Sequence, residues 1–285
     1  MITVNTVRAV KREIKKARAD GKTVGFVPTM GYLHEGHLSL MKRAKKENDV
    51  VVISIFVNPT QFGPGEDLES YPRNLKKDSE MASSVGADIL FAPDAEEMYP
   101  DGYATSVEVE GDITRQLCGK SRPGHFKGVT TVVAKFFNII RPDKAYFGQK
   151  DAQQLAVIEK MVRDLNFEVE IIPCPIVREK DGLAISSRNI YLNDSERQDA
   201  LVLSRSLFEA EEMIKKGEKD AVFIKEMIIN NIKAEQSVAI DYVKVVNSMT
   251  LLDIDKIEGD FLIALAVKIG KTRLIDNIRG ARNDS

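Results

Sequence analysis

The sequence has few of the residues that build disulfide frameworks and zinc sites. It contains only two cysteines, Cys118 and Cys174, and neither belongs to a Cys-x-x-Cys pair or to a His/Cys cluster. Two isolated thiols are typical of proteins in a reducing compartment, where disulfides rarely persist. We therefore expect two reduced cysteines, and no spacing in the sequence indicates a zinc centre.

The sequence also lacks an excess of either charge and any long apolar run. Lysine and arginine number 41 and aspartate and glutamate 43, for a formal net charge of -2, which argues against a nucleic-acid partner. The apolar runs near Val50–Val57 and Phe261–Val267 are shorter than the ~20 residues that span a bilayer. The N-terminus has no apolar signal-peptide region, so we expect a cytoplasmic protein with no membrane partner.

The order of the predicted elements indicates an α/β fold. Up to Ile172, short apolar strands alternate with segments of helical periodicity, and the β-branched run Val50–Val57 is typical of a strand buried on both faces of a parallel sheet. Repeated β-α-β order predicts a doubly wound, Rossmann-like parallel sheet with helices on both faces. The alternating segment Ala104–Val109 is predicted as a further strand.

The pattern changes after Ile172, where Pro173 and Pro175 interrupt the alternation. A chain of 285 residues is also long for one domain. The elements predicted beyond this point are two helices and three strands: Asp194–Lys216, Asp220–Ala234, Val238–Val246, Phe261–Lys268 and the short Thr272–Asp276. We therefore predict a nucleotide- and substrate-binding domain over residues 1–177 and a smaller α+β lid domain over residues 178–285.

Two of the three histidines, His34 and His37, lie three residues apart directly after a predicted strand. This spacing places both imidazoles on one face of a first helical turn, whose backbone N–H groups and dipole attract phosphate. An ordinary pair of surface or core histidines is the alternative, but the flanking Gly31 and Gly36 favour a ligand site. His-Glu-Gly-His is not the zinc-protease motif, and neither a Walker A sequence nor Gly-x-Gly-x-x-Gly is present.

A second polar cluster, Gly148–Gln154, follows the predicted strand Lys144–Phe147. Gly148 allows a ligand to approach the backbone closely, and Lys150 can neutralise phosphate charge. Asp151 can accept ribose hydroxyls or simply cap the next helix. Capping does not explain the neighbouring Lys150 and Gln154, so we interpret the cluster as part of a nucleotide site.

Two further clusters carry polar side chains. Ile185–Asn189 offers two hydroxyls and the Arg188 guanidinium behind a predicted flexible segment, Lys180–Gly182, which suits a clamp that closes on a triphosphate. An ordinary polar inter-domain loop is the alternative for this segment. Asn58–Gln61 follows a strand with amides that both donate and accept hydrogen bonds, which suits a small hydroxy acid.

Taken together, five motifs in this order resemble the pantothenate synthetases (pantoate–β-alanine ligases), a family of the nucleotidyltransferase superfamily related to class I aminoacyl-tRNA synthetases. The resemblance extends from the N-terminal strand to about Leu192 and is weaker beyond it. Its motifs are Pro28-Thr29-Met30-Gly31 with His34-x-x-His37, Asn58-Pro-x-Gln61-Phe62, Arg122-Pro-Gly-His125-Phe126, Gly148-x-Lys150-Asp151-x-x-Gln154 and Ser186-Ser187-Arg188-Asn189. Gln149 stands where glutamate is common in the family.

The resemblance implies an ATP-dependent ligase that adenylates pantoate and transfers the pantoyl group to β-alanine. It implies His37, His34, Lys150 and Arg188 as catalytic residues, with His37 as proton donor. The ATP contacts that it implies are Met30, Gly31, Tyr32, Leu33, His34, Glu35, Gly36, His37, Gly148, Gln149, Lys150, Asp151, Val177, Ile185, Ser186, Ser187 and Arg188. Gln61 and Gln154 are implied as pantoate contacts.

The family also implies Mg²⁺ as the counter-ion of ATP and a homodimer. Metal ligands are not predicted, although Asp78 is a candidate carboxylate near the metal. Two alternatives remain open at this point. One is another nucleotidyltransferase of the same superfamily that acts on a phosphorylated substrate, and the other is a nucleotide-binding module without turnover.

Overall fold

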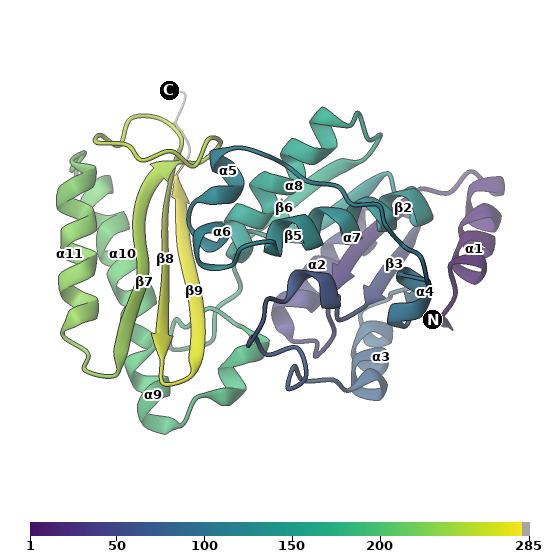
Figure 1. The fold of residues 1–285 in the computed structure, drawn as a ribbon, viewed down its shortest axis with the longest axis horizontal. Helices are drawn as coiled ribbons and strands as arrows, with labels where there is room; N and C mark the ends of the chain where they lie inside the picture. Colours follow the sequence, from purple (N-terminus) through teal and green to yellow (C-terminus); the bar gives the residue numbers. More distant parts are fainter. Residues whose placement is uncertain (281–285) are drawn as a thin grey trace. The chain divides into compact units, whose positions relative to one another are not determined.

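The computed structural model describes residues 1–280, which form two compact units (Figure 1). The first comprises residues 1–109, 122–149 and 157–175, and the second comprises residues 110–121, 150–156 and the chain from 176 onward. The first contains a parallel sheet and the second a smaller antiparallel sheet. The predicted fold class, a Rossmann-like α/β protein with a smaller C-terminal α+β part, is confirmed.

The sheet of the first unit has six strands, all paired in parallel. Their order is β1-β4-β3-β2-β5-β6, so the chain adds strands on one side of β2 and then crosses to its other side. The carboxyl ends of β2 and β5 therefore flank the point where the topology reverses, which is where such sheets bind ligands. The strands are β1 (Ile2–Val4), β2 (Val24–Thr29), β3 (Val50–Ile55), β4 (Ile89–Phe91), β5 (Lys144–Gly148) and β6 (Glu170–Cys174).

Helices of the first unit cover both faces of this sheet, because adjacent strand residues point to opposite sides. Val27 packs in the core that α2 and α3 share with the sheet, whereas the ring of Phe26 lies 5.5 Å from that of Phe136 in α7. Helix α1 packs against α7. The helices are α1 (Val7–Ala19), α2 (Glu35–Glu47), α3 (Leu75–Ser84), the short α4 (Ala95–Met98), α7 (His125–Ile140) and α8 (Ala152–Asp164), which begins in the segment assigned to the second unit.

Helix α7 approaches the loop after β3 unusually closely at Gly128. This loop contains the 3₁₀ turn η1 (Pro59–Gln61), and a Cβ atom on Gly128 would lie 2.3 Å from the Thr60 carbonyl oxygen. The Asn58 side-chain amide donates a hydrogen bond to the Gly128 carbonyl over 3.1 Å. Only glycine therefore fits at this position without a shift of backbone.

The predicted strand over Ala104–Val109 is wrong, because this segment bonds to side chains instead of to a neighbouring strand. The Val107 N–H donates to the Thr131 hydroxyl over 3.0 Å, and the Thr130 hydroxyl donates to the Val107 carbonyl over 2.6 Å. Both threonines lie on α7. A segment with an alternating sequence can thus form its backbone hydrogen bonds with side chains of a helix. The periodicity of the sequence does not distinguish this arrangement from pairing with a strand.

The second unit packs α10 and α11 against a three-stranded antiparallel sheet of order β7-β8-β9. The predicted long helix over Asp194–Lys216 is divided at Ala200, and the last strand runs on to Gly280 rather than ending at Asp276. The elements are α5 (Asp112–Arg115), α6 (Cys118–Ser121), the 3₁₀ turn η3 (Ser187–Tyr191), α9 (Asp194–Asp199), α10 (Leu201–Lys215), α11 (Ala221–Lys233), β7 (Val238–Asn247), β8 (Phe261–Ile269) and β9 (Thr272–Gly280).

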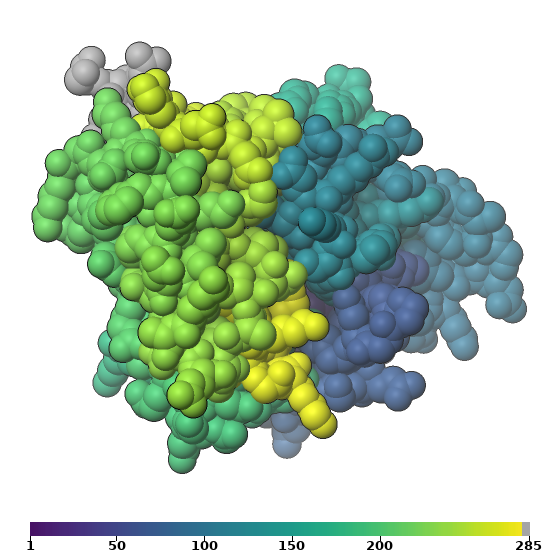
Figure 2. All heavy atoms as spheres, turned by 60° about the vertical axis from the view of Figure 1, so that its left-hand side comes forward, coloured from purple at the N-terminus to yellow at the C-terminus, as the bar shows by residue number. Residues whose placement is uncertain are grey.

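Several apolar residues of the second unit are exposed. Phe208 of α10 and Val222 and Phe223 of α11 are 40%, 50% and 49% exposed. Figure 2 shows much of this unit in green and yellow. Among residues 1–280, no helix is long and apolar enough to cross a bilayer. Cys118 and Cys174 are both buried and have free thiols, as the sequence predicts.

The close approach at Gly128 generates a test of the fold. We expect Gly128→Ala to lower the free energy of unfolding by about 1–3 kcal/mol, because the added methyl group forces backbone apart in a packed region. Urea unfolding followed by circular dichroism measures this. Gly63→Ala is the control, because its Cβ would lie 3.7 Å from the nearest atom, an ordinary contact. Equal stability of the two variants would contradict this account.

Candidate active site

The turn that follows β2 is held by a buried carboxylate from another element. Asp78 of α3 is 2% exposed, and its two oxygens accept the backbone N–H groups of Tyr32 and Leu33 over 2.8 and 2.7 Å. These bonds fix a left-handed backbone, with φ of 83° at Gly31 and 50° at Tyr32. Such a conformation is costly for a side-chain-bearing residue unless its surroundings hold it.

Asp78 thus has a structural role that differs from the one considered on sequence grounds. It was a candidate carboxylate near a metal, but both of its oxygens accept backbone N–H groups of the turn. The same packing explains Gly31, because a Cβ there would lie 2.9 Å from an Ile55 methyl group and 3.0 Å from the Asp78 carboxylate. Asp78 positions the turn.

The turn leads directly into α2 and brings the two predicted histidines together. His34 is the N-cap residue of α2, and its ring stacks on that of His37 with 3.9 Å between centroids and 25° between planes. A Cβ on Gly36 would lie 2.9 Å from the His34 ring, so glycine makes room for this stack. The imidazoles therefore sit beside the positive N-terminal end of a helix that could bind an anion.

Buried amides occupy the carboxyl end of β3. The Asn58 side-chain amide donates to the Gln61 side-chain oxygen over 3.1 Å, and the Asn58 oxygen accepts the Tyr99 hydroxyl over 2.8 Å. Because the Gln61 oxygen is engaged in this way, its Nε2 group points elsewhere and lies 3.1 Å from the Met30 sulfur. The structure thus brings the predicted substrate contact Gln61 next to the predicted nucleotide turn.

Tyr99 is a site residue that the sequence did not indicate. Burial raises the pKa of Tyr99 to about 12, so at neutral pH its hydroxyl keeps the proton that it donates to Asn58. The Lys135 ammonium lies 4.6 Å from the Tyr103 ring centre and 5.4 Å from that of Tyr99. No local motif marks Tyr99, because its role depends on a contact 41 residues away in the sequence.

The Arg122-Pro-Gly-His125 motif braces the backbone of Gln61. His125 Nδ1 lies 2.8 Å from the Gln61 carbonyl oxygen, and His125 Nε2 lies 3.0 Å from an Arg122 nitrogen. A carbonyl oxygen only accepts, so in this network Nδ1 carries the proton and Nε2 accepts from the guanidinium.

Arg122 also binds Glu66 through two hydrogen bonds of 2.7 and 2.5 Å. Burial by itself raises the pKa of the Glu66 carboxyl, but these bonds and the charge of Arg122 outweigh it and hold the pKa below its usual range. Glu66 therefore stays ionised as the guanidinium's partner.

The second predicted cluster begins at the end of β5, next to the histidine turn. β2 and β5 are neighbours in the sheet, with Gly25 paired to Lys144. The turn after Thr29 and the residues from Gly148 therefore leave the same edge at the reversal of the topology. A Cβ on Gly148 would meet no atom within 4 Å, so open space lies beside it. The chain continues through the 3₁₀ turn η2 (Gln149–Asp151) into α8.

Within the second unit, Lys150 and Ser186 line one small cavity together with Asp276 of β9. The Asn277 side chain donates to the Lys150 carbonyl over 2.9 Å, and Arg178 pairs with Asp276 over 2.6 and 2.9 Å. These contacts anchor Lys150, and also Arg178 ahead of the Ile185–Asn189 segment, to β9.

The second unit also contains the remaining predicted site residues. Ser186 caps η3 by accepting the Arg188 N–H over 3.3 Å, and Ser187 is buried. The Ile185 N–H donates to the Val177 carbonyl over 3.0 Å. Gln154 is half-buried in the first turn of α8.

The segment predicted to be flexible, Lys180–Gly182, is a hydrogen-bonded turn in the structure. The Glu179 N–H donates to the Leu183 carbonyl over 2.8 Å, and the Gly182 N–H donates to the Glu179 carbonyl over 2.9 Å. Arg197 pairs with Asp181 over 2.6 Å. The charged residues and the glycine of this segment therefore form a turn whose hydrogen-bond and ion-pair partners are defined.

The Asp78 contact generates a test that separates positioning from charge. Asparagine at this position keeps one acceptor oxygen but turns an N–H₂ group toward the other backbone N–H. We therefore expect Asp78→Asn to lower the free energy of unfolding by about 1–3 kcal/mol and to weaken nucleotide binding measured by calorimetry. Glu80→Gln removes an exposed carboxylate from the same helix and should change neither quantity. An Asp78→Asn protein with unchanged stability would refute the positioning role.

The sequence and the fold were compared with those of known proteins. Residues 2–279 match the family model described as pantoate-beta-alanine ligase. The pantothenate synthetases of Acetivibrio thermocellus and Caldicellulosiruptor bescii are 60% and 57% identical over 278 residues, which cover 98% of this chain and 99% and 98% of theirs.

Solved structures give the same result. The pantothenate synthetase of Thermus thermophilus superposes with a TM-score of 0.93 at 46% identity, covering 98% of this chain and 99% of that one. The pantoate-beta-alanine ligase of Francisella tularensis, complexed with beta-gamma ATP and beta-alanine, has a TM-score of 0.81 at 38% identity, covering 98% and 97%. The chain therefore belongs to the pantoate–β-alanine ligase (pantothenate synthetase) family.

Proposed function

We propose that this protein condenses (R)-pantoate with β-alanine to pantothenate at the expense of ATP, which becomes AMP and pyrophosphate. Family membership supports the overall reaction. The observation that carries it furthest is the turn at the reversal of the sheet. This turn contains Met30, whose sulfur lies 3.1 Å from the Gln61 amide, and it leads into the stacked His34 and His37. In this proposal a nucleotide phosphate site and a neutral polar site for a hydroxy acid would be adjacent in the first unit.

The proposed reaction has two steps. The pantoate carboxylate attacks the α-phosphorus of ATP, which forms pantoyl adenylate and releases pyrophosphate. The β-alanine amine then attacks the acyl carbon of this mixed anhydride, which forms the amide bond, releases AMP and loses a proton. Negative charge grows on the phosphorus and on the leaving pyrophosphate, so positioned donors and cations matter more than a nucleophilic side chain.

In this proposal the residues have distinct tasks. His37 donates a hydrogen bond or proton to the phosphates and His34 supports it, while Lys150 and Arg188 neutralise the growing charge. Gln61 and Gln154 hold pantoate. The nucleotide contacts would be Met30 to His37, Gly148 to Asp151, Val177 and Ile185 to Arg188.

A magnesium ion is proposed only as the partner of ATP. Residues 1–280 contain no group of three or more His, Cys, Asp or Glu side chains that could hold a metal, and Asp78 is occupied by the turn. Such an ion would be held largely by phosphate oxygens and water, as magnesium in nucleotide sites commonly is, and it would screen the charge of the triphosphate. The protein residues supply the remaining contacts.

The alternatives considered from the sequence are less well supported. A related nucleotidyltransferase that acts on a phosphorylated substrate would need cations where that substrate binds. In this chain the part of the proposed site that would hold pantoate carries the neutral amides of Asn58 and Gln61. A module without turnover would not need the histidine pair. We further propose that the protein is a cytoplasmic homodimer with a domain boundary near residue 177.

The reaction is tested by release of AMP. We expect AMP to form from ATP only when both pantoate and β-alanine are present, because β-alanine must resolve the acyl adenylate before AMP leaves. A coupled assay or chromatography of nucleotides measures it, with each substrate omitted in turn. AMP release at the background rate with both substrates present would disprove the proposed function.

The assigned roles of His37 and Lys150 are tested by single substitutions. We expect His37→Ala and Lys150→Ala each to lower kcat by about 100-fold or more, because each removes a donor or charge that acts in the transition state. Lys160→Ala is the matched control, since Lys160 pairs with Asp164 on the surface of α8. Melting temperatures should stay near that of the wild type. A drop in melting temperature that accounts for the loss of activity would indicate structural roles.

A further inference from the structure

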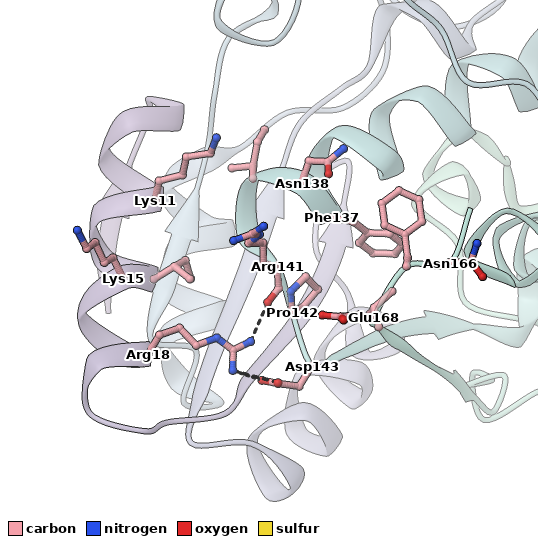
Figure 3. A pocket seen from close by; sticks show the side chains of 14 residues that line it. Lys11, Lys15, Arg18, Phe137, Asn138, Arg141, Pro142, Asp143, Asn166 and Glu168 are labelled. Carbon is pink, nitrogen blue, oxygen red and sulfur yellow. Dashed lines mark hydrogen bonds and ion pairs between the residues drawn. The ribbon is translucent and has the colours of Figure 1, made fainter. Parts of the chain in front are cut away.

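A separate hollow of about 930 Å³ lies in the first unit. It is bordered by α1, the C-terminal end of α7 and the two segments that lead into β5 and β6, namely residues 141–143 and 166–169 (Figure 3). These segments precede the strands, so the hollow lies at the amino ends of β5 and β6. The proposed catalytic residues follow the carboxyl end of β5, roughly 16 Å away along this five-residue strand.

The floor of the hollow is apolar. Ile14, Phe137, Ile139, Pro142 and Val169 line it and are all buried. The ring of Phe137 meets that of Phe167 edge to face with 5.6 Å between centroids. Together these side chains expose a limited apolar surface to the hollow, against which the carbon atoms of a ligand could pack.

The rim is polar and carries more positive than negative side chains. It contributes the cations Lys11, Lys15, Arg18 and Arg141 and the carboxylates Asp143 and Glu168. Arg18 is already occupied, because it pairs with Asp143 over 2.7 Å and donates to the Arg141 carbonyl over 2.7 Å. Among the described residues, none of Lys11, Lys15 and Arg141 has a carboxylate within ion-pair distance.

Arg141 stands at a position where the backbone itself favours glycine. It is the C-cap residue of α7 with φ of 51°, and its N–H donates to the Phe137 carbonyl over 2.8 Å. Helices that end in this left-handed conformation usually place glycine there. In Figure 3 the Arg141 side chain is drawn between those of Asn138 and Arg18, which also line the hollow.

We propose that this hollow binds a small organic anion, a phosphate or carboxylate carried on an apolar body. Arg141 and Lys11 would pair with the anionic group, and the floor around Phe137 would bury the apolar part. The three cations without counter-ions match the anionic group of such a molecule, and the aromatic carbon beside them matches its apolar body. This site would be additional to the proposed nucleotide site and independent of the reaction proposed above.

Direct titration of the whole protein tests the proposal. The probes are phenyl phosphate and phenylacetate, measured by calorimetry with a non-hydrolysable ATP analogue saturating the nucleotide site. We expect saturable binding of at least one probe, which identifies the preferred anion, and weaker binding at higher salt because exposed charges are screened. Inorganic phosphate alone should bind more weakly than phenyl phosphate, because it cannot use the apolar floor.

Variants locate the binding. Arg141→Gly removes the guanidinium while it relieves the left-handed backbone, so the protein should fold at least as well as the wild type. We expect Arg141→Gly and Lys11→Gln each to weaken probe binding about fivefold or more, in line with the loss of one charged contact. Arg8→Gln on α1 removes the same charge outside the hollow and should leave the affinity unchanged.

Two outcomes would overturn the proposal. One is the absence of saturable binding of either probe. The other is binding whose affinity is equal in the wild type, Arg141→Gly and Lys11→Gln, because the probe would then occupy a different part of the surface. The activity of the enzyme is not needed for either readout.

Discussion

The carboxylate of Asp78 is the contact on which the proposed site depends. It accepts two successive backbone N–H groups, at Tyr32 and Leu33, and so holds a turn that would otherwise be strained. That turn sets where α2 begins and therefore where its first helical residues point. The stacking of His34 on His37 follows from this starting point, as does the place of Met30 beside Gln61. These two hydrogen bonds thus help to orient Met30, His34 and His37.

A second constraint on the proposed site acts through α7. The helix reaches the loop after β3 because Gly128 has no side chain, and Asn58 closes the contact with a hydrogen bond. The Tyr99 hydroxyl and the N–H and hydroxyl of Thr60 all donate to the Asn58 oxygen, so the Asn58 amide group faces Gln61 and engages its oxygen. An amide whose orientation is fixed in this way can distinguish a hydroxyl or carboxylate from a group that only donates. We therefore expect this packing to make the neutral polar end of the proposed site selective.

Much of the fold could be predicted because local periodicity coincides with tertiary burial. The buried strand beginning at Val50 and the strand predicted at Lys144–Phe147 follow their patterns closely. The prediction failed where backbone groups found partners that periodicity does not show. Val107 bonds to threonine hydroxyls of α7, and the long helix predicted from Asp194 is interrupted at Ala200. The proposed roles of His37, Lys150 and Arg188 remain predictions from motif and resemblance.

The sequence by itself determined the type of sheet, the family and the residue types available for chemistry, because these depend on local patterns and ordered motifs. The tertiary structure alone decided how those residues are oriented. Asp78 and Tyr32 are 46 residues apart, and Asn58 and Tyr99 are 41 apart. It also decided that Lys11 and Arg141 border one hollow with an apolar floor. The turn at His34 and His37 could thus be recognised from the sequence, but the carboxylate that holds it could not, because contacts across such separations leave no local pattern.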